Sequence, residues 1–130
     1  MILTIRTDKP DAEVALFDAG GKKQFDYTWH ADRQLAKELL GVLRDQLANV
    51  GADFTTLTGV VVFKGPGSFT GLRIGITVAN TLAYGLDIPI VATDGDSWRA
   101  DGLKRLAENQ NDRLALPHYG AEANITMPKK

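Results

Sequence analysis

The chain has 130 residues, 44% of them apolar and 24% charged, and this length and composition are typical of one globular domain, expected at residues 1–115 and followed by a C-terminal tail at 116–130. Because the sequence contains no cysteine and its formal net charge is −1, thiol catalysis and cysteine-ligated zinc are excluded, and tight direct binding to nucleic acid is disfavoured. No segment approaches the roughly 20 apolar residues that span a bilayer, and the N-terminal apolar run is too short for a signal peptide, so we expect a cytoplasmic protein without membrane contact.

The first thirty residues predict three β-strands. Apolar and polar side chains alternate over residues 1–7, 13–17 and 24–29, as in strands that bury one face. Gly20 and Gly21 lie between the second and third of these runs, where glycine supplies the positive φ of a tight hairpin. We therefore expect a three-stranded antiparallel meander.

Residues 32–50 predict the first helix. Their apolar side chains recur at spacings of three, four or seven, and Gly51 follows where a glycine is expected after the end of a helix. The residues that set this period are Leu35, Leu39, Val42, Leu43, Leu47 and Val50.

The remaining elements alternate between strands and helices. Compact β-branched runs at 59–63 and 88–93 are typical of strands buried on both faces, and Pro89 stands near the start of the second run, where a missing amide donor does least harm. Helices are expected at 70–86 and 97–109. The order β-β-β-α-β-α-β-α predicts an α/β fold with a mixed sheet, in which helical crossovers join the later strands.

A glycine-rich turn joins the strand at 59–63 to the helix that follows it. A strand, a glycine turn and a helix together form the arrangement in which backbone amides and a helix dipole receive an anion. A P-loop needs a lysine and a hydroxyl residue directly after its last glycine, and neither follows Gly71. The spacing of Gly65, Gly67 and Gly71 also exceeds the dinucleotide fingerprint by one residue.

Two interpretations of this turn remain open. In the simpler one, the glycines shape a sharp strand-to-helix turn, and Ser68 or Thr70 caps the helix. In the other, the amides after Gly65 form the anion site of a small nucleotide-binding or phosphotransfer enzyme. No metal site is expected, because His30 and His118 are far apart in the sequence and cysteine is absent.

The helix at 70–86 is unusual because no charged residue occurs from position 74 to its end. A surface helix normally carries a solvated polar stripe. Small residues also recur at every fourth position, which would let another helix approach closely; they are Gly71, Gly75, Ala79 and Ala83. The helix is therefore covered on both sides by its own domain or buried against a partner. With only two other helices in the chain to cover it, we favour the partner.

The turn and the start of this helix read GPGSFTGLRIG from Gly65 to Gly75. This segment resembles the signature of the TsaB (YeaZ) family, which belongs to the actin-like ATPase-fold superfamily. The order of elements over residues 1–95 is also similar to the N-terminal half of longer members. The resemblance implies one actin-like ATPase-type (ribonuclease H-like) half, in which the signature turn comprises Gly65, Pro66, Gly67, Ser68, Phe69, Thr70 and Arg73.

The resemblance also implies a role in tRNA threonylcarbamoyladenosine (t6A) modification. Family members are non-catalytic scaffold subunits that pair through their two N-terminal helices with a larger paralogue, TsaD, and a TsaE-like ATPase commonly joins them. We therefore expect no catalytic residue and no cofactor here, with ATP or metal on partner subunits, tRNA contacted only indirectly, and a homodimer as a further possible state. Carried onto this chain, the implied partner interface is Leu35, Leu39, Val42, Gly71, Leu72, Gly75, Ile76, Ala79, Leu82 and Ala83.

Two features depart from the family pattern. Longer members have an acidic residue near the end of the first strand, where this chain has Arg6, so a residual nucleotide site is disfavoured. A full member also has a second α/β half before its tail, whereas this chain has only residues 94–115 in that interval. The ending from His118 to Lys130 is similar to the tyrosine-containing, proline-flanked end of longer members, and we therefore expect an internal deletion.

Overall fold

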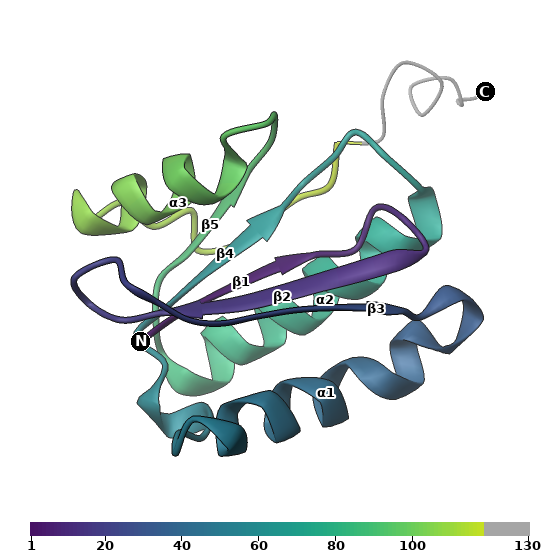
Figure 1. Cartoon of the computed structure of the whole chain (residues 1–130). Helices are drawn as coiled ribbons and strands as arrows, with labels where there is room; N and C mark the ends of the chain where they lie inside the picture. The colour runs from purple at the N-terminus through teal and green to yellow at the C-terminus, as the bar shows by residue number, and fades with distance from the viewer. Residues whose placement is uncertain (119–130) are drawn as a thin grey trace.

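A computed structural model describes residues 1–118, apart from the side chain of Asp32, and shows three layers built on one mixed sheet. The strand order in the sheet is β3-β2-β1-β4-β5. Helices α1 and α2 lie side by side on one face, and α3 covers the other face over β4 and β5 (Figure 1). The predicted α/β fold with a mixed sheet is therefore confirmed.

The predicted elements are all present, with ends that differ by a few residues. The strands are β1 (Ile2–Arg6), β2 (Asp11–Phe17), β3 (Lys23–His30), β4 (Gly59–Phe63) and β5 (Ile90–Thr93). The helices are α1 (Leu35–Asn49), α2 (Phe69–Leu86) and α3 (Trp98–Ala107). Short 3-10 turns at Asp32–Gln34 and Phe54–Thr56 precede α1 and β4.

The meander β1-β2-β3 is antiparallel, whereas β4 and β5 run parallel to β1, as helical crossovers require. Gly21 has φ +85° in the predicted hairpin, and Gly51 has φ +73° directly after the end of α1. Both glycines therefore have the positive φ that is expected at these positions from the sequence.

The expected side-chain cap of α2 is wrong. Ser68 stands at the N-cap position, but its side chain makes no capping hydrogen bond, and Thr70 lies within the helix. Asp101 places a negative charge in the first turn of α3, where it interacts favourably with the helix dipole.

The core lies mainly between the sheet and the pair α1 and α2. Side chains alternate along each strand, so β1 and β4 present a continuous apolar surface to these helices, formed by Leu3, Ile5, Val60 and Val62. Helix α1 closes this layer with four buried leucines, at every fourth position: Leu35, Leu39, Leu43 and Leu47. This burial accounts for the helical period of the apolar residues in the sequence.

Helix α3 packs closely on the opposite face. A Cβ on Gly102 would enter the side chain of Val61, so glycine sets how near the helix lies to β4. Trp98 meets Phe63 edge to face, with ring centroids 5.8 Å apart. Arg99 reaches across the sheet to Asp26 of β3 at 3.1 Å. Burial alone would raise the pKa of Asp26, but the hydrogen bonds and charges of Arg99 and Lys23 together outweigh it and lower this pKa.

The chain after α3 turns back along the outer edge of β5. The amide of Asp112 donates to the Ile90 carbonyl at 2.8 Å, and its carboxylate accepts from the Ala92 amide at 2.9 Å. Arg105 of α3 pairs with the same carboxylate. Burial alone would raise the pKa of Asp112, but the hydrogen bonds from Arg105 and Ala92 outweigh it and hold the pKa below its ordinary value.

This edge segment continues past the expected end of the domain at residue 115. Ala115 is buried, and the Asn80 side chain bonds both its amide (2.8 Å) and its carbonyl (3.0 Å), as a neighbouring strand would. The amide of His118 then donates to the Lys64 carbonyl at 2.7 Å. The described part of the predicted tail, 116–118, is therefore held against the domain, while the remainder of the tail lies outside the described residues.

A candidate interaction groove between helices α1 and α2

The backbone of the signature turn packs directly against two other parts of the chain. Gly65 has φ +113°, and a Cβ there would enter the carbonyl oxygen of His118. A Cβ on Gly67 would lie 2.5 Å from the Cβ of Asp8, in the loop between β1 and β2. Both positions therefore require glycine for packing within the chain.

The same turn is poorly suited to bind an anion. The amide of Ser68 donates to the Asp8 carbonyl at 3.3 Å, and the Asp8 side chain lies against Gly67. The Asp8 side chain therefore occupies the space beside the turn, and the Ser68 amide is already bonded within the chain. This geometry favours the simpler interpretation, in which the glycines shape the turn.

Arg6, which stands where the family pattern has an acidic residue, is used within the domain. Its Nε lies 2.7 Å from Oδ1 of the buried Asp8, and its guanidinium lies 3.9 Å from the centroid of the Phe63 ring. The hydrogen bond to Asp8 raises the pKa of Arg6 above its ordinary value. Among residues 1–118, no three His, Asp or Glu side chains form a group that could hold a metal ion.

Gly71 and Gly75 of α2 face the loop after β1, and not another helix. A Cβ on Gly75 would lie 3.0 Å from Cγ2 of Thr7 and closer still to Oγ1, while one on Gly71 would enter the Thr7 carbonyl. The Thr7 hydroxyl donates to the Gly71 carbonyl at 2.7 Å. The stripe of small residues thus serves packing inside the domain.

Seven of the ten residues expected at the partner interface are buried in the chain's own core. The sheet covers the inner side of α2, so the other two helices of the chain are not the only cover for it. The buried members are Leu35, Leu39, Leu72, Gly75, Ile76, Ala79 and Ala83. Val42, Gly71 and Leu82 are partly exposed.

The surface that α2 does expose borders a groove of about 350 Å³. Ala36 of α1 forms one side, and α2 contributes Phe69, Thr70, Arg73, Ile74, Thr77 and Val78. These residues define the α1–α2 groove. Most of its walls are apolar, and its α2 side carries no carboxylate, so it can accept an apolar side chain from another molecule at low desolvation cost.

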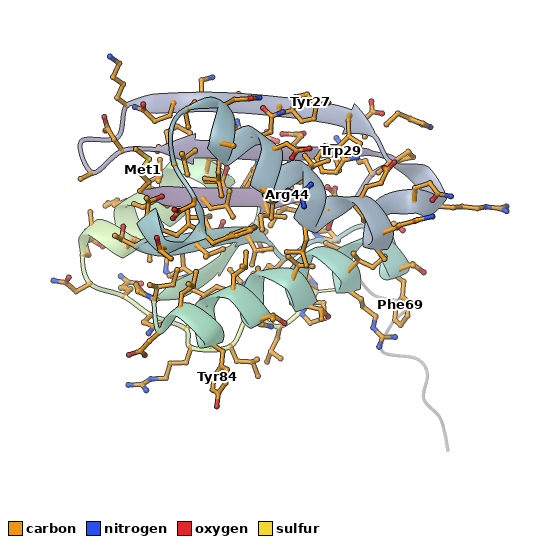
Figure 2. The ribbon with its side chains drawn as sticks, turned by 90° about the horizontal axis from the view of Figure 1, so that it is seen from below. Met1, Tyr27, Trp29, Arg44, Phe69 and Tyr84 are labelled. Carbon is orange, nitrogen blue, oxygen red and sulfur yellow. The ribbon has the colours of Figure 1, made fainter. Side chains whose placement is uncertain are left out.

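Two exposed aromatic residues stand at opposite ends of α2. Phe69, at the start, is 53% exposed, and Tyr84, in the last turn, is 91% exposed. Figure 2 shows both side chains directed away from the body of the domain. Arg73 lies over Phe69, with its guanidinium carbon 5.3 Å from the ring centroid.

The outer stripe of α2 could have been read from the sequence. Its five residues recur at helical spacing and include three threonines: Thr70, Ile74, Thr77, Val78 and Thr81. The buried residues of α2 include no hydroxyl side chain, and this contrast distinguishes the two faces. No helix in the described part of the chain is long and apolar enough to cross a membrane.

Comparison with known proteins first defines the class. The sequence model of one family, described as TsaD: tRNA N6-adenosine threonylcarbamoyltransferase, matches residues 29–94, about half of the chain. The fold is similar to the solved structure of YeaZ from Pseudomonas aeruginosa, with a TM-score of 0.67 and 29% identity, covering 78% of this chain and 49% of that one. The chain is thus an α/β protein with a ribonuclease H-like fold.

Curated relatives then define the family. The tRNA threonylcarbamoyladenosine biosynthesis protein TsaB of Escherichia coli is 31% identical over 125 residues, covering 91% of this chain and 53% of the relative. The TsaB protein of Haemophilus influenzae is 30% identical over 115 residues, covering 88% and 48%. The chain belongs to the TsaB (YeaZ) family. It spans about half the length of the curated relatives it matches.

Proposed function

We propose that this chain is a non-catalytic subunit of the machinery that makes threonylcarbamoyladenosine in tRNA, and that it binds a TsaD-type partner through the α1–α2 groove. The family and the names of its relatives support the pathway. The observation that carries the proposed partnership is the groove itself, because an exposed apolar face between two helices is typical of a protein interaction site.

The exposed side of α2 supports a protein partner over a small substrate. From residue 69 to residue 86 the only charged side chain is Arg73, so a partner that covers the helix has to pair a single charge on it. Phe69 lines the groove, is 53% exposed and projects away from the domain (Figure 2). Aromatic anchors of this kind dominate the energetics of many protein interfaces.

In the proposed complex this chain stabilises its partner and supplies no reacting group. ATP or a metal ion would be held by partner subunits, a TsaE-like ATPase could join the pair, and tRNA would be contacted through the partner. In the absence of a partner, the same groove is the surface through which we expect two copies of the chain to associate.

Analytical ultracentrifugation of this chain mixed with the TsaD-type protein of its own organism tests the proposal. We expect a complex at micromolar concentration. Thr77→Glu places a carboxylate in the groove at an exposed position and should abolish the complex without lowering the melting temperature. The matched control Ala100→Glu, on the exposed side of α3, should leave it intact. The absence of a complex for the unmodified chain would refute the proposal.

The alternative function, nucleotide binding or phosphotransfer at the glycine-rich turn, has its own test. Because Asp8 lies against the turn, we expect calorimetry with ATP and magnesium to show at most millimolar binding. Micromolar binding accompanied by turnover would establish the enzyme and contradict the scaffold role.

A further inference from the structure

A second hollow continues the α1–α2 groove toward the start of the chain. It has a volume of about 320 Å³ and shares Thr70 and Ile74 with the groove. Lys9, from the β1–β2 loop, and Arg33, from the turn before α1, line it on the side away from α2. We call the two hollows together the extended groove.

The extended groove contains three cations without a counter-charge. Lys9, Arg33 and Arg73 are exposed, and none forms an ion pair with any side chain described in the structure. None of the described residues that line the two hollows is acidic. The neighbouring carboxylate of Asp8 is only 6% exposed and is already paired with Arg6. The charged side chains that the structure places in the lining of the extended groove are therefore all positive, although the chain as a whole has a net charge of −1.

The walls between these cations combine apolar side chains with a few hydroxyl residues. Ile74 separates the two hollows, Val78 and Ala36 line the first, and Leu35 and Ala31 line the second. A ligand that fills the extended groove must therefore combine apolar side chains with carboxylates at their flanks. A partner helix with acidic residues beside an apolar stripe has this chemistry.

We propose that the segment of the partner seated in the extended groove is an acidic amphipathic helix, whose carboxylates pair with Arg33 and Arg73 while its apolar side chains fill the hollows. This inference rests on the proposed function, since it specifies the chemistry of the TsaD-type partner at the same groove. RNA is the less favoured occupant. Three cations neutralise too few phosphates for tight binding.

The test measures the dissociation constant for the full chain and the TsaD-type protein by calorimetry at about 50 and about 300 mM NaCl, a range over which exposed charges become strongly screened. Arg33→Gln/Arg73→Gln removes two charges from the groove. Lys22→Gln/Lys104→Gln removes the same charge from the hairpin and from α3, away from the groove. Each groove cation should contribute about threefold to affinity, so the groove double variant should bind roughly tenfold more weakly at low salt, with a smaller salt dependence than the unmodified chain.

The outcomes separate this inference from the function on which it rests. If the unmodified chain binds the partner, but both double variants bind with unchanged affinity and salt dependence, the acidic helix is refuted and the proposed function stands. If the unmodified chain does not bind the partner, both fail. The third measurement is the fluorescence anisotropy of fluorescein-labelled tRNA, with the unmodified chain and with Arg33→Gln/Arg73→Gln. If these substitutions weaken the binding of tRNA but leave the binding of the partner unchanged, the groove receives nucleic acid and the inference is overturned.

Discussion

Gly75→Ala tests whether the small residues of α2 serve the core of this domain. The new Cβ would lie 3.0 Å from Cγ2 and 3.1 Å from Cβ of Thr7, and it would overlap the Oγ1 of the same residue. Thr7 is buried, and its β-branched side chain has little freedom to turn away. The substitution must therefore displace the loop after β1 or the start of α2.

The expected cost follows from three contributions. Overpacking a well-packed site costs about 1–3 kcal/mol. Displacement of the hydroxyl also weakens the 2.7 Å hydrogen bond from Thr7 to the Gly71 carbonyl, at a cost of about 1 kcal/mol. The higher helix propensity of alanine offsets about 1 kcal/mol of this. We therefore expect a net loss of about 1–3 kcal/mol in the free energy of unfolding.

Gly85→Ala is the matched control, because it makes the same change in the same helix. Gly85 is exposed, and a Cβ there would meet nothing within 4 Å. This variant should gain up to about 1 kcal/mol from helix propensity. Urea denaturation of both variants provides the comparison. In the double variant Thr7→Ala/Gly75→Ala, removal of Oγ1 and Cγ2 should recover part of the loss. Equal stability of Gly75→Ala and Gly85→Ala, or no coupling between positions 7 and 75, would refute the packing argument.

Three further predictions concern the edge segment and the first strand. Asp112→Asn should lower the free energy of unfolding by about 1–2 kcal/mol at neutral pH. Because the pKa of Asp112 is lowered in the folded state, the difference in this free energy between the variant and the unmodified chain should be present above about pH 4 and should disappear as the pH falls below it. Urea titrations at several pH values measure it. Asn80→Ala removes both hydrogen bonds from the Asn80 side chain to Ala115, so limited proteolysis should cut residues 111–118 faster than in the unmodified chain. An unchanged rate would show that these hydrogen bonds do not hold the segment in place. Arg6→Met leaves the buried carboxylate of Asp8 unpaired and should cost about 3 kcal/mol in thermal or chemical unfolding, with much of the loss recovered in Arg6→Met/Asp8→Asn.

The sequence was sufficient to predict the fold because local signals agreed with the tertiary structure. The strands alternate as half-buried strands do, the leucines of α1 fall on one face, and Gly21 and Gly51 stand where left-handed backbone is needed. These features depend on residues close together in the chain, which makes them visible without coordinates.

The candidate site was less predictable because it depends on contacts that are distant in sequence. The approach of Thr7 to Gly75 joins residues 68 positions apart, and nothing in the period of α2 indicates that a loop covers its glycines. For the same reason, the pairing of Arg6 with Asp8 and the stacking of Arg6 on Phe63 could not be read from the substitution at position 6. The segment 111–118 forms no regular element, so its packing along β5 and α2 carries no periodic signal.

The most direct measurement of the central claim is site-specific photocrosslinking to the TsaD-type protein. A benzoylphenylalanine at Thr77, in the α1–α2 groove, is compared with one at Ala100, on the exposed side of α3. The account predicts a covalent adduct from position 77 and none from position 100. A crosslink from position 100 alone would contradict it, because the partner would then lie on the opposite face of the sheet.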